Sequence, residues 1–242
     1  MSLTIGCDPE LVCRINGRFS RARDHFKSNS SMGLDGNDSV AEVRPGYSES
    51  PLDLTAKIRT ILEYGNEKSP DVELISGHYA DGYPIGGHIH LSISPCENIV
   101  DSLDVVLTSL SNCIDDKSQR QKRERSGYGQ RKAFRNKSYG MEYRTPGSWL
   151  LSPATSLVTL TLAKLSVIGS SELNLDFSAI KGNHTSKTFL RNFDTYFSEI
   201  PEDCQEGIAQ LKLLLVKDKI TWNQNLLPNW GLANSEFLKE AA

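Results

Sequence analysis

The stretch GGHIHLSIS, residues 86–94, decides the fold because apolar and polar side chains alternate along it. An extended strand points successive side chains to opposite faces. One face carries Ile89, Leu91 and Ile93, and the other carries His88, His90, Ser92 and Ser94. Such a two-faced strand is typical of an antiparallel sheet that is covered by helices on one side.

The segments on either side of this strand fit the same architecture. A short run ending in Asn16-Gly17 predicts an early hairpin, because both residues tolerate positive φ in a tight turn. Pro51 suits the start of a helix and Gly65 its end. Further strands are expected at residues 39–44, 72–75 and 139–144, with helices at 51–65, 99–114, 152–168 and around 208–215. The predicted fold class is α+β, with an antiparallel β-sheet and helices packed on one face.

Size, composition and charge are those of an ordinary globular protein. The chain has 242 residues, of which 38% are hydrophobic and 24% charged, and we expect one domain over residues 1–242. Five scattered cysteines without a CxxC pair predict neither a disulfide framework nor a structural zinc site. No apolar run approaches the ~20 residues of a membrane span, and the first residues lack a secretion signal. A cytoplasmic protein without a membrane partner is therefore expected.

Positive charge is concentrated in residues 117–137, which hold nine Lys or Arg against one Glu. Their glycines and polarity predict a long loop. The formal net charge of −3 makes nucleic acid an unexpected partner. A solvated face or a lid over phosphates is the commoner meaning of such a run, and Arg131 and Arg135 are the predicted phosphate contacts.

Four short segments place polar side chains two residues apart on predicted strands, so both members of each pair share one face. They are Asp8-Pro9-Glu10, Glu42-Val43-Arg44, His88-Ile89-His90 and Glu142-Tyr143-Arg144. The first also fits a hairpin turn, and the two ExR segments also fit surface ladders of opposite charge. If the strands share a sheet, its charged face needs bound cations to neutralise the carboxylates.

The residue types narrow the chemistry of that face. Carboxylates with one or two imidazoles suit Mg²⁺ or Mn²⁺ better than zinc, and such ions ordinarily bind substrate phosphates. A guanidinium matches a phosphoryl or carboxylate group and stabilises the charge of a transferring phosphoryl group. Carboxylates, metal and arginine together predict phosphoryl transfer.

The order of these motifs resembles the superfamily of glutamine synthetase and glutamate-cysteine ligase. More closely, GCDPEL (6–11), AEVRP (41–45), GGHIHL (86–91) and YGMEYRTPGSWL (139–150) are similar to the phage-type amidoligases, the type 2 carboxylate-amine ligases. The similarity covers about residues 6–150, and residues 151–242 are expected to be a mostly helical part without a further motif. If the chain is phage-encoded, its compartment is the host cytoplasm.

The resemblance implies a half-barrel sheet, with ATP and two or more divalent ions on its concave face. Asp8, His88 and Glu142 would then hold one metal ion, and Glu10 and Glu42 another. His90 would touch phosphate or substrate, Arg144 would bind the ATP phosphoryl group and steady it during transfer, and Arg44 is a candidate for the substrate carboxylate. Those synthetases have more glutamates on the middle strand, so Asp35 or Asp38 is a candidate for the missing ligand.

The implied reaction transfers the γ-phosphoryl group of ATP to a carboxylate and forms an amide through an acyl phosphate. The substrates would be a small-molecule or peptide carboxylate and an amine, and the oligomeric state is left open. A cupin-like metalloenzyme is a first alternative, although no glutamate follows His90 at the cupin spacing. A metal-dependent hydrolase and a non-catalytic nucleotide-binding module are the other two.

Overall fold

The strand that carries His90 lies in the middle of a five-stranded antiparallel sheet. The structure is a computed structural model and describes residues 3–181, 186–193, 196, 200–216 and 220–232. The strand order is β11 (Phe134–Lys137), β12 (Gly140–Tyr143), β10 (Ile89–Leu91), β1 (Ile5–Cys7) and β6 (Tyr47–Ser48). The predicted strand at 88–94 is confirmed, but its paired part ends at Leu91.

A second five-stranded sheet contains the early hairpin. Its strands are β3 (Arg18–Ser20), β2 (Glu10–Ile15), β5 (Val40–Val43) and β4 (Met32–Leu34), and β7 (Glu73–Ile75) also pairs with β2. Asn16 and Gly17 have φ values of 51° and 70°, which confirms the predicted hairpin turn. The Ser, Gly and Asn content of residues 28–38 predicts a loop, but β4 lies inside this segment, so that prediction was wrong over Met32–Leu34.

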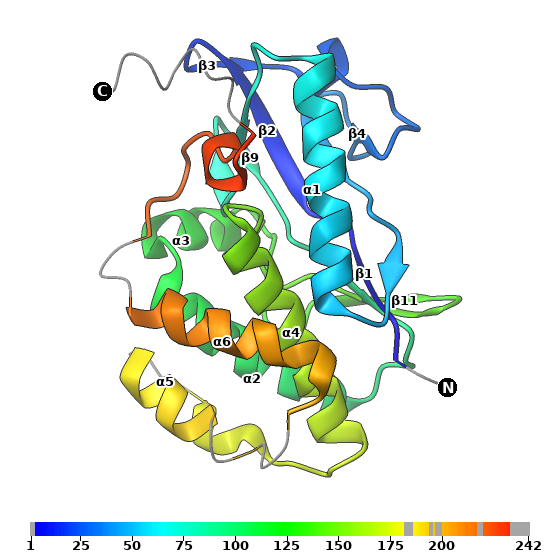
Figure 1. Ribbon diagram of the computed structural model, residues 1–242, viewed down its shortest axis with the longest axis vertical. Coiled ribbons are helices and arrows are strands. Elements are labelled where there is room, and N and C mark those ends of the chain that lie inside the picture. The colour runs from blue at the N-terminus through cyan, green and yellow to red at the C-terminus, as the bar shows by residue number, and fades with distance from the viewer. Residues whose placement is uncertain (1–2, 182–185, 194–195, 197–199, 217–219, 233–242) are drawn as a thin grey trace.

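The two sheets meet at Asp8-Pro9, where β1 passes into β2 (Figure 1). Backbone hydrogen bonds continue across the break, from Asp8 N to His88 O at 3.3 Å and from Glu10 N to Gly86 O at 2.8 Å. Proline has no N–H to donate, so the regular ladder is interrupted at this point. The sheets together form the predicted half-barrel, and the first acidic motif sits at the junction. A separate small hairpin joins β8 (Tyr79–Ala80) and β9 (Tyr83–Pro84).

Helices cover the apolar face of the first sheet. Ile89, Leu91, Met141 and Tyr143 are fully buried, and the Tyr143 hydroxyl donates to Asp104 of α2 at 3.2 Å. The α-helices are α1 (Pro51–Lys68), α2 (Glu97–Ile114), α3 (Lys117–Arg125), α4 (Pro153–Ser171), α5 (Ser186–Phe193) and α6 (Glu202–Val216), and the 3₁₀ turns are Ala22–Asp24, Phe177–Ile180 and Leu227–Trp230. The prediction of an α+β fold with helices on one face is confirmed.

Two helices start at local sequence signals, whereas the predicted helix end at Gly65 is wrong. Ser50 caps α1 and Ser152 forms a capping box with Thr155 at the start of α4. Gly65 does not end α1, which continues to Lys68. A Cβ at Gly65 would lie 2.2 Å from the sulfur of Met32, so this glycine permits close packing of α1 on β4.

The basic segment contains two elements that the loop prediction missed. Asp116 caps α3 by accepting hydrogen bonds from the N–H groups of Ser118 and Gln119, and β11 forms a projecting hairpin with β12 (Figure 1). α3 has no apolar stripe, because Arg123 is its only buried residue. Hydrophobic periodicity therefore gave no sign of this helix.

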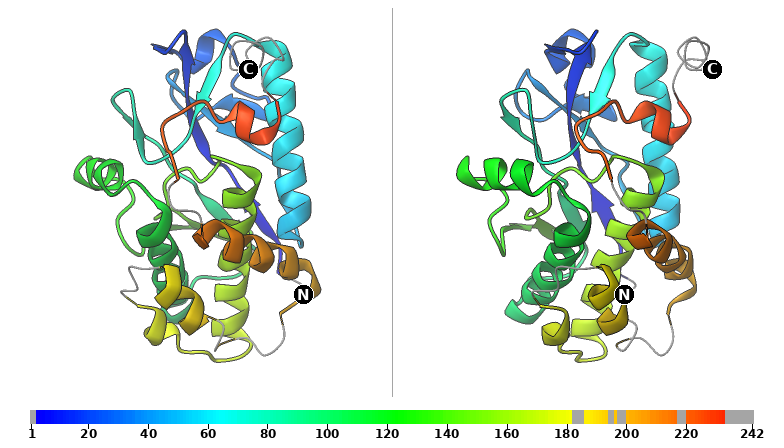
Figure 2. Two further views of the ribbon diagram at one scale, coloured as in Figure 1. Left: turned by 60° about the vertical axis from the view of Figure 1, so that its left-hand side comes forward. Right: turned by 90° about the vertical axis from the view of Figure 1, so that its left-hand side faces the viewer.

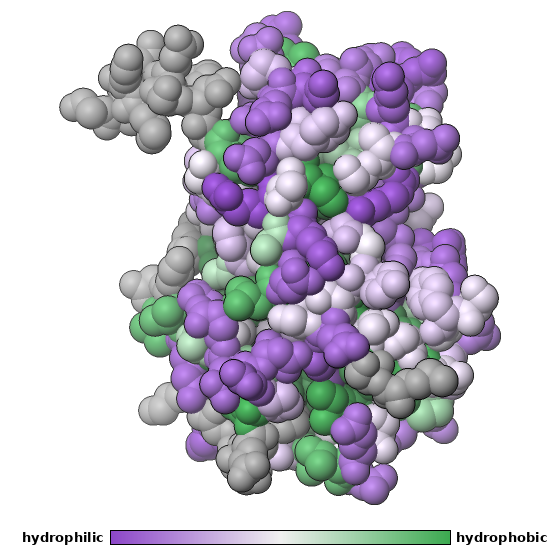
Figure 3. All heavy atoms as spheres, turned by 45° about the vertical axis from the view of Figure 1, so that its right-hand side comes forward, coloured by the Kyte–Doolittle hydropathy of each residue, from purple (hydrophilic) through white to green (hydrophobic). Residues whose placement is uncertain are grey.

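One connected hydrophobic core reaches from Ile5 to Leu232 and draws on both sheets and the helices. Among the described residues, α4 alone is long and apolar enough to cross a membrane, and 83% of that window is buried within the protein. Hydrophilic residues predominate on the face shown in Figure 3, where hydrophobic residues form only small separate groups.

Candidate active site

The polar face of the first sheet collects residues from three of the four motifs. The register places Gly6 of β1 opposite His90 of β10, and His90 opposite Glu142 of β12. Asp8 follows β1 by one residue and His88 precedes β10 by one residue. The antiparallel pairing therefore brings side chains 134 positions apart in the sequence onto one surface, as residues 8 and 142 show.

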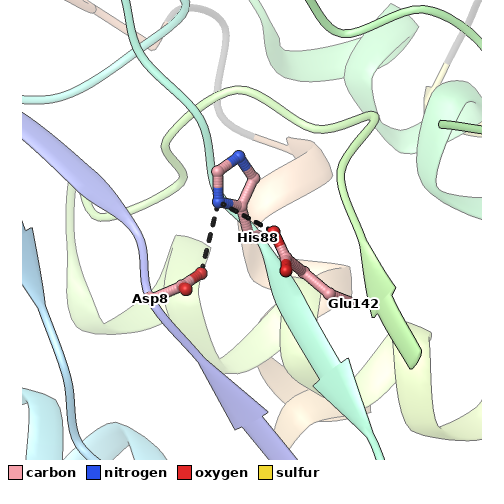
Figure 4. Close-up of side chains that lie close together, drawn as sticks. All are labelled: Asp8, His88 and Glu142. Carbon is pink, nitrogen blue, oxygen red and sulfur yellow. Dashed lines mark ion pairs between the residues drawn. The ribbon is translucent and has the colours of Figure 1, made fainter. Parts of the chain in front are cut away.

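Asp8, His88 and Glu142 form a compact group on this surface, with both carboxylates turned toward the imidazole (Figure 4). His88 Nδ1 lies 3.3 Å from Asp8 Oδ1 and 3.7 Å from Glu142 Oε1. One ligand atom from each residue lies within 4.8 Å of the others. A Cβ on Gly86 would lie 2.5 Å from His88 Nε2, so the glycine before the motif leaves room for the ring.

Glu10 and Glu42 form a second acidic pair beside this group. They lie directly opposite each other on β2 and β5, and His88 Nε2 is 3.7 Å from Glu10 Oε1. Glu10 also accepts a hydrogen bond from the N–H of Gly86 at 2.6 Å. Asp35 acts electrostatically on both glutamates, whereas Asp38 pairs with the exposed Arg23. Of the two loop aspartates predicted from the sequence, Asp35 is the one near the site.

The two acidic groups differ in their protonation. Burial disfavours the charge of Asp8, but the imidazoles of His88 and His90 outweigh it and hold the pKa of Asp8 well below its ordinary value. Burial, with the charge of Asp35, raises the pKa of Glu10 to about 8. Burial, with the charge of Asp8, raises the pKa of Glu42 to about 8. Arg44 beside Glu42 and Arg123 near Glu10 act in the opposite direction, but they do not outweigh burial and the neighbouring carboxylates.

Protein cations surround the carboxylate of Glu142, which is only 2% exposed. Arg144 Nε lies 3.0 Å from Glu142 Oε1, and Lys137 Nζ lies 2.6 Å from Oε2. Arg135 stands opposite Glu142 in the register, with its guanidinium 3.9 Å from Oε1. Lys137 was missed in the sequence, because only the pairing of β11 with β12 brings it to the site.

The other two predicted arginines, Arg44 and Arg131, do not contact the Asp8, His88 and Glu142 group. Arg44 forms an ion pair with Glu42 and donates to the carbonyls of Ser28, Ser30 and Leu34. Arg131 lies 3.9 Å from Asp104 on α2 and is not among the residues in contact with the acidic group. His90 does reach the group, with Nε2 3.0 Å from Asp8 Oδ2.

Residues 5–222 match the family model described as phage phiEco32-like COOH.NH2 ligase, type 2. The chain belongs to this family. A search among curated proteins finds no match. Among solved structures, a crystal structure described as a novel glutamine synthase homolog aligns with a TM-score of 0.48 and 11% sequence identity, covering 95% of this chain and 70% of that one.

In this COOH.NH2 ligase, the acidic group lies between two cavities with unlike linings. The larger cavity, of about 540 Å³, is lined by Asp8, Glu42 and His90 at its acidic end and by Tyr47 and Tyr139 elsewhere. Tyr139 packs against His90 with ring centroids 5.6 Å apart. Its volume falls within the range usual for ligand pockets.

The smaller cavity of the ligase, of about 150 Å³, is lined by His88 together with Arg123, Arg144, Tyr128 and Gln130. Arg123 is 3% exposed and donates to the carbonyl oxygens of Thr145 and Arg144. Burial lowers the pKa of Arg123 to about 10, so its guanidinium stays charged at neutral pH. Sequence reasoning missed Arg123, because nothing in the basic run separates it from its exposed neighbours.

The donors of the acidic group fit a divalent cation. Two carboxylates and one imidazole converge from separate strands, and a second pair of carboxylates stands beside them. Oxygen-rich sets of this kind suit Mg²⁺ or Mn²⁺. The raised pKa values of Glu10 and Glu42 fit the same conclusion, since a bound cation would add positive charge beside both carboxylates.

Proposed function

We propose that this member of the COOH.NH2 ligase family uses ATP to join a carboxylate to an amine through an acyl phosphate. The observation that carries the proposal is the position of the Asp8, His88 and Glu142 group. It stands between a large cavity with aromatic walls and a small cavity with two guanidiniums. A nucleotide and a carboxylate could therefore approach the same cation site from different sides.

The geometry supports one assignment of the metal ligands. Asp8, His88 and Glu142 would hold one Mg²⁺ or Mn²⁺ ion, and Glu10 and Glu42 would hold a second. When bound, such ions neutralise phosphate oxygens and stabilise the charge that develops during phosphoryl transfer. The imidazole of His88 faces both Asp8 and Glu142 through Nδ1, so it orients the two carboxylates toward a common point.

ATP would occupy the larger cavity. Two tyrosines that line this cavity, Tyr47 and Tyr139, can contact the adenine base. The phosphates would meet the cations at the acidic end of the cavity, beside Asp8, His90 and Glu42. Arg144 contacts Glu142 and lines the smaller cavity, so its guanidinium can bridge the γ-phosphoryl group and the substrate carboxylate. Arg135 is the candidate for a further phosphate contact, 3.9 Å from Glu142.

In the first step a carboxylate oxygen attacks the γ-phosphorus of ATP, the bond to the β–γ bridging oxygen breaks, and ADP leaves. In the second step an amine attacks the acyl carbon, inorganic phosphate leaves, and the amine loses a proton. The protein's part is to hold the reactants in line and to stabilise negative charge with Arg144 and Arg123. Phosphorylation makes the acyl carbon reactive because phosphate is a good leaving group.

The alternative functions predicted from the sequence differ in whether they need ATP and whether they release ADP. A hydrolase would release product without ATP, and a non-catalytic nucleotide-binding module would bind ATP without releasing ADP. Family membership favours the ligase over the cupin-like and hydrolase alternatives. A cytoplasmic location and the absence of nucleic acid or membrane partners stay predictions.

The proposal is tested by incubating the protein with Mg²⁺, ATP, mixed carboxylic acids and hydroxylamine. Hydroxylamine traps an acyl phosphate as a hydroxamate, so a ligase forms hydroxamate and ADP in equal amounts. Glu142→Gln should abolish both products, whereas Glu63→Gln on the exposed side of α1 should change neither. ADP release without hydroxamate would contradict the acyl-phosphate mechanism, and binding without ADP release would favour the non-catalytic module.

A further inference from the structure

We infer that the carboxylate substrate is an acidic polypeptide, recognised outside the smaller cavity by the exposed basic side chains of α3. One carboxylate of that polypeptide would enter the cavity, while neighbouring carboxylates would contact Lys122 and Arg125. This inference rests on the proposed function, because it names the substrate class of the same site.

α3 has no role in the hydrophobic core. Arg123 is its only buried residue, and the other eight residues are polar or charged. A helix of nine residues is marginal without packing, so α3 depends on its Asp116 cap and on the contacts of Arg123 with Thr145 and Arg144. The helix therefore has two distinct sides. One delivers a guanidinium to the smaller cavity, and the other presents cations to solvent.

The exposed residues of α3 carry a net positive charge, because Lys117, Lys122 and Arg125 stand against Glu124. Lys122 and Arg125 are exposed, and neither forms an ion pair with any of the residues that the structure describes. They stand three positions apart, where side chains of a helix are neighbours and like charges repel. The nearby Lys132 differs, because it pairs with Asp101 of α2 at 2.5 Å. An anionic ligand would relieve the repulsion on α3.

The position of α3 fits a polymeric substrate. The helix projects from the body of the protein on the side opposite α1 (Figure 2). Its last turn leads directly into Gly127, Tyr128 and Gln130, which line the smaller cavity. A chain lying along α3 would thus pass the mouth of the cavity that contains Arg123 and Arg144.

The size of the cavity selects what can enter. About 150 Å³ is well below the 300–1,000 Å³ of ordinary ligand pockets. A carboxylate on a short aliphatic stem fits such a volume, whereas the body of a large substrate must remain outside. The guanidinium of Arg144 can bind the carboxylate, and the buried Arg123, whose NH2 groups donate to backbone carbonyls, adds positive charge beside it.

The chemistry favours a polypeptide over a nucleic acid. A nucleic acid would satisfy the outer cations but has no carboxylate to be phosphorylated. An acidic polypeptide supplies both the negative charge and the carboxylate. Each Asp or Glu side chain can act as a counter-ion for α3 or as the reacting group. Electrostatic contacts of this kind weaken steeply with salt.

Binding of fluorescent poly-L-glutamate to the full chain tests the inference, with Mg²⁺ and a non-hydrolysable ATP analogue present at low salt. We expect Lys122→Glu/Arg125→Glu to weaken binding by about tenfold or more. The matched control, Arg18→Glu/Arg59→Glu, makes the same change in charge at exposed residues away from α3 and should leave binding unchanged. Equal weakening in both double variants, or none in either, would overturn the inference.

Turnover separates this inference from the proposed function. With hydroxylamine as the amine, poly-L-glutamate should be converted at a lower KM than free glutamate, and the α3 variant should remove that difference without lowering kcat. Conversion of free glutamate with no preference for the polymer would overturn the inference and leave the ligase intact. Absence of ADP release with every acid would contradict the ligase itself. Tighter binding of a single-stranded oligonucleotide than of poly-L-glutamate would assign α3 to nucleic acid and reject the polypeptide.

Discussion

The two halves of the acidic cluster hold their carboxylates in opposite ways. Asp8 and Glu142 face cationic or hydrogen-bond-donating side chains, namely the histidines on one side and Arg144 with Lys137 on the other. Glu10 and Glu42 face each other across β2 and β5, with Arg44 beside Glu42 alone. The first half is balanced by the protein, whereas the second half holds protons near neutral pH.

This difference indicates where a bound cation contributes most. A carboxylate with a protein partner can stay ionised in the absence of metal. A buried carboxylate whose neighbouring cations do not outweigh burial and nearby negative charge takes up a proton instead, as Glu10 and Glu42 do, and a divalent ion must displace that proton. The first half is therefore organised in advance for chemistry, while the second half couples metal binding to pH.

The largest expected effect is on the first half. Glu142→Gln removes a metal ligand and leaves Arg144 and Lys137 without their shared carboxylate. We expect the rate of ADP release to fall on the order of 10²–10³-fold or more, with a lower melting temperature of the metal-free protein. Steady-state kinetics and thermal unfolding measure both. Unchanged activity would show that Glu142 is not a ligand in the reaction.

The second prediction concerns the pH dependence of the other half. The pKa of Glu42 is about 8 in the folded protein against 4.5 ordinarily, so the folded state holds a proton that the unfolded state has lost. The stability contributed by this proton is fully present below about pH 4.5 and is lost as the pH rises through 8. For the metal-free protein we expect stability to fall over that window, by at most about 1.4 kcal/mol per pH unit for each such glutamate.

Glu42→Gln provides the test, since glutamine has no proton to lose. Chemical denaturation at several pH values should show a shallower fall for the variant than for the natural chain, and added Mg²⁺ should remove the fall in the natural chain. A steeper fall in the variant would contradict the assigned direction of the shift. Asp8 does not interfere, because its lowered pKa acts only below its ordinary value of 3.8.

The third prediction concerns Arg44, the cation beside Glu42. Arg44 is held by three backbone carbonyls of residues 28–34, and a Cβ on Gly33 would lie 2.2 Å from its guanidinium. Gly33→Ala should therefore displace Arg44 and destabilise the protein by about 1–3 kcal/mol. Gly36→Ala, in open space nearby, is a control for the loss of a glycine, although its φ of 54° adds some backbone strain. Urea unfolding measures the free energy of unfolding of both variants. An equal decrease in Gly33→Ala and Gly36→Ala would refute the specific role of Arg44.

The smallest expected effect concerns the aromatic wall next to the first half. Tyr139 packs on His90 and lines the larger cavity. Tyr139→Leu should weaken ATP binding by about threefold to tenfold, since such ring contacts contribute about 0.5–1.5 kcal/mol. Tyr139→Phe keeps the ring and should bind ATP as the natural chain does. Calorimetric titration with ATP in the presence of Mg²⁺ measures the affinity of each variant. An unchanged affinity in Tyr139→Leu would contradict the placement of the nucleotide in this cavity.

The fold was predictable where the pattern is local. The alternation of residues 86–94, the Asn16-Gly17 turn and the helix starts at Pro51 and at Ser152-Pro153 all depend on a few neighbouring residues, and all are confirmed. Prediction failed at α3, β4 and Gly65. α3 has no apolar face. β4 is a strand of three residues that pairs with β5 only 7–11 positions along the chain, and Gly65 packs against Met32, 33 positions away.

The sequence by itself determined which residue types the site would use, because acid-x-acid, HxH and ExR spacings put side chains on one face of a strand. It did not determine their partners. Glu42-x-Arg44 and Glu142-x-Arg144 have the same spacing, yet Arg44 lines the larger cavity and donates to three loop carbonyls, while Arg144 lines the smaller cavity. Only the tertiary structure decided this, since charge compensation depends on groups that folding brings within a few ångströms.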